Sequence, residues 1–455
     1  MNIAVFTDTY FPDINGVASS ISAMIEGLRQ KGHKVFVFCI SEPSRKITMV
    51  SSNPPVFRVP SIPVFFAKPY RAVLPELLPL IEMCKKYKID IVHSHTEFSM
   101  GLMGGMVANC LGLPQIHTYH TMWEDYTHHI SKGHTFPDRQ FKSLARKYSK
   151  YFCSHADALI VPTAKVYNYL TSKGVDVLTF QIPSGIDLKD FRRDLEDPSE
   201  TLAIREKFGL SPDDKVLLSI GRIAFEKSLD LIIRAMPGIL TKVPNARLVM
   251  IGDGPELKNL RDLVNELGLG SSVILPGPVA FADVHKYYHI GDVFISCSTT
   301  ETQGLTYYEA MAAGLPVIAR YDESLESIIV DGRNGRIFHD PAELPELVSE
   351  VLSDFSRDQY LQMSANACES VDPFDIGTFA DRIEDAYLKT IEHHANVHNL
   401  RDHNIFRHIG YKLRSGTNTA VTATDRGIRK IFKPLIKQRR NRSRRRRLLK
   451  AMKSK

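Results

Sequence analysis

The chain alternates short apolar runs with longer stretches of helical periodicity. The apolar run at 2–8 is followed by a loop, by a helical pattern that ends at Lys31-Gly32, and by a second apolar run at 34–40. A glycine after the last turn is a common helix stop. Strand, helix and strand in this order form a βαβ unit, which predicts a parallel sheet. Further strands are expected at 90–95, 114–120 and 158–163.

The same alternation starts again after residue 184. Strands are expected at 215–222, 246–255, 292–298 and 316–320, with helices between them. We therefore predict an α/β fold with two doubly wound, Rossmann-like domains, residues 1–184 and 185–374. A helix near 375–395 is expected to return to the first domain. Because parallel sheets bind ligands at the carboxyl ends of their strands, the cleft between the domains is the expected site.

Charge separates this body from the end of the chain. Residues 396–455 carry 19 lysines and arginines against 2 acidic residues, whereas residues 1–395 carry 39 basic and 49 acidic residues. A strongly basic tail therefore follows an acidic globular body. The six cysteines are scattered, the N-terminus does not resemble a secretory signal, and no apolar run reaches about 18 residues. These features predict a cytoplasmic protein with reduced thiols.

Two glutamates stand in an otherwise apolar segment, "STTETQGLTYYEAMAAG" (298–314). Glu301 follows an expected strand, and Glu309 lies two turns into the next expected helix. If the segment were helical, the two would be roughly 12 Å apart along the axis, too far to share a metal ion. Two such carboxylates suit an elongated ligand with hydroxyl pairs at both ends and a phosphate at the helix N-terminus. A capping glutamate and an exposed helix glutamate explain the spacing equally well.

A second candidate site follows the strand at 215–222. Arg222 and Lys227 suit a diphosphate, because a guanidinium fork binds one phosphate and an ammonium binds the other. Surface pairing with Glu226 is the alternative, and on this segment alone it is the more frequent arrangement. Gly252 in "IGDGPE" and Gly16 in "FPDINGV" mark loops where the backbone can approach a ligand closely.

Histidines gather after two expected strands of the first domain, in "HSHTE" (93–97) and "HTYH" (117–120). A zinc site is conceivable, but no HExxH motif or cysteine ligand supports it. A histidine at a strand end is more often a structural hydrogen-bonding group. His120 ends its strand where the first domain would face the cleft, so it is a candidate to meet a reacting sugar.

Together these segments resemble the retaining glycosyltransferases of family 4, which have the GT-B fold. The resemblance covers residues 1–395 and rests on the two glutamates, the Arg222–Lys227 segment, "GDGPE", the "NGV" loop and His120. Two stretches, "HTYHTMWEDYTHHISKG" (117–133) and "TETQGLTYYEAMAAGLPV" (300–317), are similar to the bacterial 1,2-diacylglycerol 3-α-glucosyltransferases. The first loop departs from the family pattern, because it holds one glycine instead of two.

The resemblance implies transfer of glucose from UDP-glucose to the sn-3 hydroxyl of 1,2-diacylglycerol, with retention. The product would be the α-monoglucosyl lipid that can anchor lipoteichoic acid. No metal ion and no cofactor besides the donor substrate would be needed. UDP-galactose as donor, and another lipid or a saccharide as acceptor, stay open. The oligomeric state is not predicted.

The resemblance also assigns roles to single residues. Arg222 and Lys227 would hold the donor diphosphate and stabilise the charge of the leaving group. Glu309 would hold the ribose hydroxyls, Glu301 the hydroxyls of the transferred sugar, and His120 would lie near the anomeric carbon. The loop and backbone positions that would contact the donor are Gly16, Gly252, Gln303, Gly304 and Leu305.

Diacylglycerol stays in the bilayer, so the enzyme would work as a peripheral protein on the inner face of the cell membrane. The segment 139–152 predicts a basic amphipathic helix, suited to an anionic lipid surface. Its apolar positions are Phe141, Leu144, Ala145, Tyr148 and Phe152, and its basic positions are Arg139, Lys142, Arg146, Lys147 and Lys150. A domain helix with an apolar core face and a solvated basic face explains the pattern equally well.

The basic tail holds a second amphipathic pattern at 427–440. Its apolar positions are Ile428, Ile431, Phe432, Leu435 and Ile436. The apolar stripe favours a lipid surface over a nucleic acid, although an arginine run also binds phosphate backbones. A solvated tail without a partner is the third interpretation.

Overall fold

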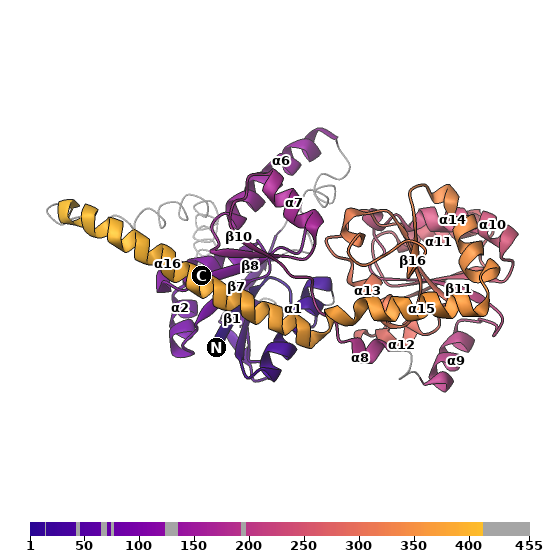
Figure 1. Cartoon of the computed structure of the whole chain (residues 1–455), viewed down its shortest axis with the longest axis horizontal. Helices are drawn as coiled ribbons and strands as arrows, with labels where there is room; N and C mark the ends of the chain where they lie inside the picture. The colour runs from indigo at the N-terminus through magenta and orange to yellow at the C-terminus, as the bar shows by residue number, and fades with distance from the viewer. Residues whose placement is uncertain are drawn as a thin grey trace, which may run out of the picture. The chain divides into compact units, whose positions relative to one another are not determined.

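The computed structural model describes residues 1–13, 15–41, 46–64, 71–73, 77–122, 135–192 and 197–412 (Figure 1). Met1–His394 form one compact unit and Ala395–Lys455 form a second. The first unit contains two large β-sheets, built from consecutive parts of the sequence. None of the helices in the described ranges is long and apolar enough to cross a membrane.

The first sheet has eight strands in the order β10-β9-β8-β7-β1-β2-β4-β3. Neighbouring strands are parallel except β3, which is antiparallel to β4. A separate antiparallel pair consists of β5 (Ser61–Pro63) and β6 (Arg71–Val73). The strands of the sheet are β1 (Asn2–Thr7), β2 (Lys34–Ile40), β3 (Thr48–Val50), β4 (Val56–Val59), β7 (Ile91–Ser94), β8 (Gln115–Thr118), β9 (Ala158–Val161) and β10 (Leu178–Gln181).

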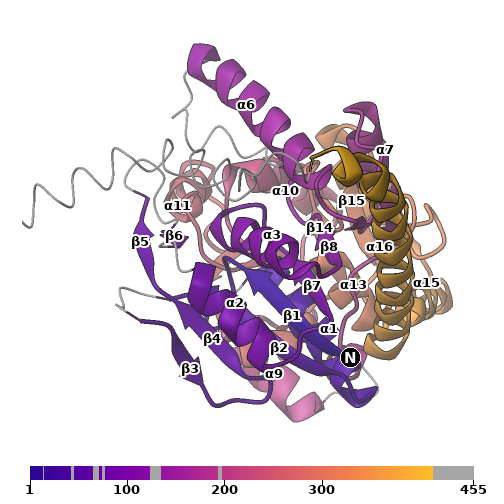
Figure 2. The same ribbon diagram turned by 90° about the vertical axis from the view of Figure 1, so that its left-hand side faces the viewer.

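Both faces of this sheet are covered, which explains why its central strands are continuous apolar runs. In β1, Ile3 and Val5 join a core with helix α1, whereas Ala4 and Phe6 join a core on the opposite face with α2 and α3 (Figure 2). The alternation follows from the two-residue period of a strand. The helices of this part are α1 (Gly16–Gln30), α2 (Leu77–Lys86), α3 (Ser99–Leu111), α6 (Thr135–Cys153) and α7 (Ala164–Ser172).

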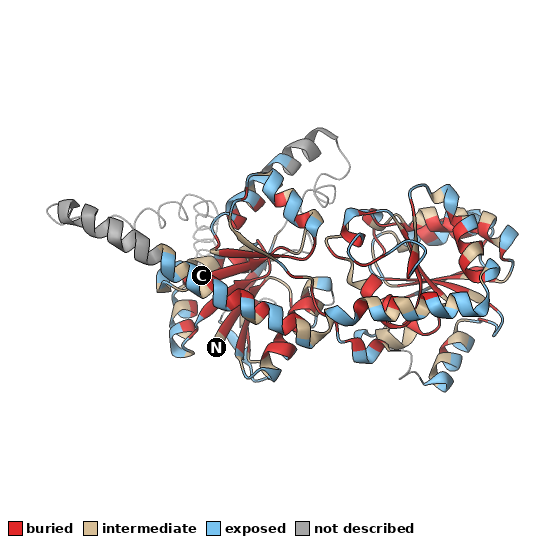
Figure 3. Ribbon diagram, in the orientation of Figure 1, coloured by how far each residue is buried: buried red, intermediate tan, exposed pale blue. Residues whose placement is uncertain are grey.

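The second sheet has six parallel strands in the order β13-β12-β11-β14-β15-β16. They are β11 (Lys215–Ile220), β12 (Ala246–Ile251), β13 (Val273–Gly277), β14 (Val293–Ser296), β15 (Val317–Arg320) and β16 (Gly335–Phe338). The strands lie in the buried interior of the domain (Figure 3). The α-helices are α8 (Leu188–Phe191), α9 (Pro198–Lys207), α10 (Leu229–Lys242), α11 (Leu257–Glu266), α12 (Val284–Tyr288), α13 (Leu305–Ala312), α14 (Leu344–Ser349) and α15 (Arg357–Val371).

The last described helix, α16 (Ile376–Lys412), begins against the first sheet. Phe379, Ile383 and Tyr387 belong to the same buried core as Ile21 and Met24 of α1. Close contact between the two helices requires a residue without a side chain: a Cβ atom on Gly27 of α1 would lie 2.6 Å from the Cβ atom of Ala380. We call the first sheet, the helices α1, α2, α3, α6 and α7, and the start of α16 the first domain, and the second sheet with α8–α15 the second domain.

Candidate functional site

Glu301 lies just beyond the end of β14, where it forms an ion pair with Lys227. Lys227 ends η2 (Phe225–Lys227), the short 3-10 helix that follows β11. The Lys227 Nζ and Glu301 Oε1 atoms are 2.5 Å apart, and the side chains are 26% and 13% exposed. Burial alone would raise the pKa of the Glu301 carboxyl, but the charge and hydrogen bond of Lys227, with smaller contributions from Ser298 and Lys165, together outweigh burial and hold this pKa below its usual range. Glu301 is therefore a largely buried carboxylate.

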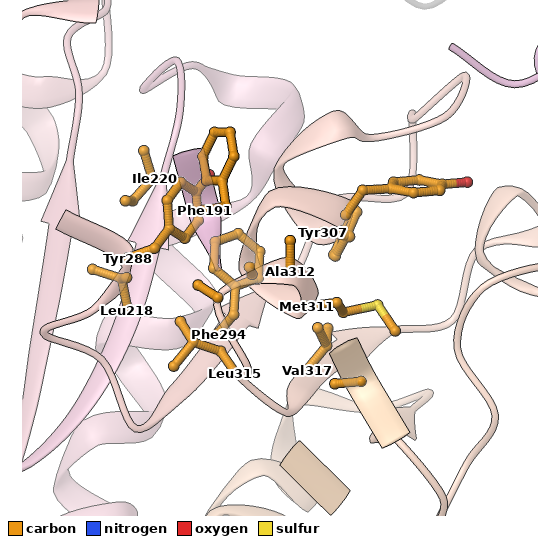
Figure 4. Packing of buried hydrophobic residues seen from close by; sticks show 14 of the residues in the cluster. Phe191, Leu218, Ile220, Tyr288, Phe294, Tyr307, Met311, Ala312, Leu315 and Val317 are labelled. Carbon is orange, nitrogen blue, oxygen red and sulfur yellow. The ribbon is translucent and has the colours of Figure 1, made fainter. Parts of the chain in front are cut away.

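Glu309 lies on α13, within a densely packed part of the second domain. Tyr307 and Met311 of this helix are buried among residues such as Tyr288 and Phe294 (Figure 4). The Tyr288 hydroxyl donates a hydrogen bond of 2.6 Å to Glu309 Oε2. Burial raises the pKa of the Glu309 carboxyl, and the Tyr288 hydrogen bond lowers it by a smaller amount. The alternative of a fully exposed helix glutamate is excluded, because Glu309 is half-buried.

The N-terminus of α13 lies between loops from both domains. Gly304 caps the helix with a φ of +78°, a conformation that favours glycine. A Cβ atom on Gly16, at the start of α1, would lie 3.9 Å from Leu305 Cδ1, and one on Gly221 would lie 3.9 Å from Thr306 Cγ2. The structure therefore brings Gly16, Gly304 and Leu305 together. The first N–H groups of this helix suit an anion.

The side chain of Gln303 makes contacts that the sequence did not indicate. Its amide accepts a hydrogen bond of 2.8 Å from the backbone N–H of Ser184 and donates one of 3.0 Å to the Ser184 carbonyl oxygen. The Ser184 hydroxyl is in turn bonded to Ser20 of α1 at 2.7 Å. Gln303 thus fixes the segment before α13 to the segment between the domains and, through Ser184, to α1.

Arg222 forms an ion pair with Glu226, as the alternative interpretation of this segment expected. The Arg222 side chain is 45% exposed, whereas that of Glu226 is 3% exposed. Gly221, the residue before Arg222, lies next to Thr306 of α13, so the segment borders the helix N-terminus. The proposed role of Arg222 at a diphosphate stays a prediction.

The glycines of "GDGPE" have a structural explanation. A Cβ atom on Gly252, which has a φ of +149°, would lie 1.8 Å from the Gly221 carbonyl oxygen. A Cβ atom on Gly254 would lie 2.0 Å from the Ile223 carbonyl oxygen. Two neighbouring loops therefore meet backbone to backbone, and Gly252 supports the segment that carries Arg222. A direct contact of Gly252 with a donor is not needed to explain the residue.

The strand-end histidines His93, His95 and His120 form a largely buried hydrogen-bonded group. His95 Nδ1 and His120 Nε2 are 3.0 Å apart, and the His93 and His95 rings, tilted by 34°, have centroids 3.9 Å apart. His93 is bonded to Tyr387 of α16 and to Thr118, both through ring nitrogens. Burial, with a smaller contribution from His117, lowers the pKa of His120 to about 3, so its imidazole is neutral at physiological pH. Within the described ranges, no group of three or more His, Cys, Asp or Glu side chains is arranged to hold a metal ion.

The first domain contacts the Thr299–Gln303 segment directly. The Thr302 hydroxyl donates to the His120 carbonyl oxygen, and the Thr163 hydroxyl donates to the Thr302 carbonyl oxygen, both at 2.8 Å. Lys165 of α7 bonds the carbonyl oxygens of Thr299 and Glu301 and pairs with Asp322. His120 and the Glu301 segment, predicted separately, are thus neighbours. The sequence prediction missed Lys165, although it follows strand β9 at the edge where ligands were expected.

The helix at 139–152 corrects one part of the membrane prediction. In the described part of α6, Phe152 is buried, and the Tyr148 hydroxyl donates to the Glu97 carbonyl oxygen. Phe152 packs against His117, and Tyr148 is bonded to the backbone of the first domain, so these two apolar positions are not free to enter lipid. Arg146, Lys147 and Lys150 are exposed. This is the arrangement of a domain helix with a solvated basic side.

Other predicted membrane contacts lie outside the described residues. These are the side chains of Arg139, Phe141, Lys142 and Leu144, and the tail positions Ile428, Ile431, Phe432, Leu435 and Ile436.

Comparison with known protein families finds a match in each of two regions of the chain. Residues 14–190 match Glycosyltransferase Family 4, and residues 200–369 match the glycosyl transferases group 1. An alpha-monoglucosyldiacylglycerol synthase of Streptococcus pneumoniae is 37% identical over 77% of this chain and 78% of its own length. The enzyme of the same name from Acholeplasma laidlawii is 37% identical over 86% of this chain and 98% of its own length.

Solved structures with the same fold include glycosyltransferases. Anabaena HepE in complex with UDP and glucose aligns with 86% of this chain and all of its own, with a TM-score of 0.68 and 17% identity. Sucrose-phosphate synthase from Thermosynechococcus elongatus aligns with 85% of this chain and 98% of its own, with a TM-score of 0.67 and 21% identity. The predicted GT-B fold of two Rossmann-like domains is confirmed.

The Tyr288–Glu309 hydrogen bond can be tested by titration. In Tyr288→Phe the carboxylate loses its donor while burial remains, so the pKa of Glu309 should rise further above its usual range. Carbon-13 NMR of labelled glutamate carboxyls measures this pKa, and Glu309→Gln assigns the signal. Tyr307→Phe is the matched control, because that hydroxyl bonds Ser296. An unchanged or lower pKa in Tyr288→Phe would contradict the arrangement.

Proposed function

Because the chain belongs to glycosyltransferase family 4, we propose that it transfers glucose from UDP-glucose to the sn-3 hydroxyl of 1,2-diacylglycerol, with retention of the α configuration. The observation that carries this proposal is the 37% identity, over most of their length, to two alpha-monoglucosyldiacylglycerol synthases. The candidate site supports it, because the carboxylates of Glu301 and Glu309, the cation of Lys227 and the N-terminus of α13 lie within one region of the second domain.

The donor would lie across α13. Glu309 would accept hydrogen bonds from the ribose hydroxyls, and Glu301 from hydroxyls of the glucose. Lys227, Arg222 and the first N–H groups of α13 would bind the diphosphate. An ammonium has three N–H donors and a carboxylate about four acceptor positions. The Lys227–Glu301 pair can therefore bind a ligand without separating.

The reaction would exchange one bond at the anomeric carbon. The bond from C1 to the diphosphate oxygen breaks, and a bond to the acceptor oxygen forms on the same face. The departing phosphate oxygen takes the proton of the acceptor hydroxyl, so the products are α-glucosyldiacylglycerol and UDP. Lys227 and Arg222 stabilise the charge that develops on the diphosphate, so this step needs no metal ion. His120 takes part as a neutral hydrogen-bonding group.

A direct assay tests the proposal. We expect labelled UDP-glucose and mixed micelles containing dioleoylglycerol and phosphatidylglycerol to give an α-glucosyl lipid, and UDP-galactose to give much less product. The anomeric configuration is read by proton NMR. A galactolipid as the main product would favour the alternative donor. No glycolipid from either donor, with RNA binding that persists at physiological salt, would favour a nucleic-acid partner for the tail.

We further propose that the basic side of α6 holds the enzyme on anionic lipid through charge. Arg146, Lys147 and Lys150 are exposed near the C-terminal end of α6. Near an anionic surface each basic residue contributes about 1 kcal/mol, so the three would matter most at low salt.

Replacing Arg146, Lys147 and Lys150 by glutamine should weaken binding to phosphatidylglycerol vesicles by roughly ten- to a hundredfold at low salt. Vesicle sedimentation measures the binding, and phosphatidylcholine vesicles should show no difference. The matched control replaces three exposed lysines of the second domain, Lys207, Lys242 and Lys258. Deletion after Ala395 separates the contribution of the tail. Equal binding of both triple variants, with or without the tail, would contradict a role of α6.

A further inference from the structure

Lys165 joins three separate parts of the chain through one ammonium group. It is the second residue of α7, in the first domain. Its Nζ atom lies 2.6 and 2.8 Å from the two carboxylate oxygens of Asp322, which precedes η4 (Glu323–Leu325) of the second domain. The same atom lies 3.1 Å from the carbonyl oxygen of Glu301 and 3.3 Å from that of Thr299.

These charges are largely removed from water. The Lys165 side chain is 14% exposed and that of Asp322 is 3% exposed. Removing one member of such a pair leaves the other charge buried without compensation, which is strongly destabilising. The contact between Lys165 and Asp322 is therefore costly to break. Asp322 is further fixed because its Oδ1 atom accepts a hydrogen bond of 2.8 Å from the Ser324 N–H.

Neighbouring contacts hold the same segment. Thr163, two residues before Lys165, bonds the Thr302 carbonyl oxygen, and Thr302 bonds the carbonyl oxygen of His120. The Asn168 side chain of α7 donates a hydrogen bond of 3.0 Å to Glu323 Oε1. The first domain thus supplies hydrogen-bond donors to three carbonyl oxygens of this segment, those of Thr299, Glu301 and Thr302, and Lys165 is the charged donor. The charge of Lys165 also helps to keep Glu301 ionised.

We propose that Lys165 is a positioning residue: with Asp322 it holds the Thr299–Gln303 segment so that the Glu301 carboxylate meets the sugar being transferred. This proposal rests on the proposed glucosyl transfer. Lys165 does not touch the donor, but acts through the backbone on either side of Glu301. Its contact from α7 also makes the position of Glu301 depend on the first domain, where His120 lies.

The expected effect is on turnover and not on nucleotide binding. Misplacement of a reacting group by about 1 Å can cost a hundredfold in rate, so Lys165→Met should lower kcat about 10- to 100-fold. The proposed contacts to UDP lie in the second domain, so the dissociation constant of UDP should stay within about threefold of the wild-type value. Tm should fall, because Asp322 is left buried without its cation.

The double variant Lys165→Met/Asp322→Asn separates positioning from stability. It removes both charges, so Tm should recover relative to Lys165→Met. The carbonyl oxygens of Thr299 and Glu301 still lack their donor, so kcat should remain low. Recovery of kcat together with Tm would overturn the proposal, as would a kcat of Lys165→Met within about twofold of wild type. Lys173→Met, at the C-cap of the same helix, is the control and should change neither.

A second readout keeps this test independent of the acceptor. Slow hydrolysis of UDP-glucose to glucose and UDP uses the same donor contacts, with water in place of the lipid. If the wild-type protein hydrolyses UDP-glucose but makes no glycolipid, the proposed acceptor is wrong and Lys165 can still be tested. If hydrolysis by Lys165→Met equals that of the wild type, the positioning role is wrong, whatever the acceptor.

Discussion

The ion pair between Lys227 and Glu301 is the interaction on which the site depends. A largely buried carboxylate or ammonium needs a partner of opposite charge, because an uncompensated buried charge is strongly destabilising. The pair is possible because Lys227 follows β11 and Glu301 follows β14, and these strands are neighbours in the second sheet. Parallel strands bring their carboxyl ends to one edge, so residues 74 positions apart meet there. Glu309 lies on α13, the helix that starts at this edge.

The first domain completes this arrangement from the carboxyl ends of its own strands. His120 follows β8, and Lys165 follows β9, the next strand of that sheet. Both are bonded to the Thr299–Gln303 segment: the His120 carbonyl oxygen accepts a hydrogen bond from Thr302, and the Lys165 ammonium donates one to the Glu301 carbonyl oxygen. The candidate site is therefore assembled from both domains at the ends of parallel strands, and each domain alone holds only part of it. The start of α16 adds to this through Tyr387, which bonds His93 within the histidine group.

Features set by local sequence were predictable. The buried strands of parallel sheets are apolar runs, so β1, β2, β11, β12 and β14 could be placed from sequence alone. The three-residue strands β3, β5 and β6 are too short to leave such a pattern. Contacts between distant residues were not predictable: Lys165 depends on Asp322, 157 positions away. Periodicity also gave α6 an apolar side, but could not show that Phe152 faces the protein core.

Glu301 and Glu309 are proposed to bind opposite ends of one donor, the sugar and the ribose. The most direct test is calorimetric titration of UDP and UDP-glucose into Glu309→Ala and Glu301→Ala. We predict that Glu309→Ala weakens both ligands by the same factor. Glu301→Ala should weaken UDP-glucose while UDP binds as tightly as before or more tightly, since Lys227 is released from its pair. If Glu301→Ala weakened UDP binding by the same factor as UDP-glucose binding, the assignment would be contradicted.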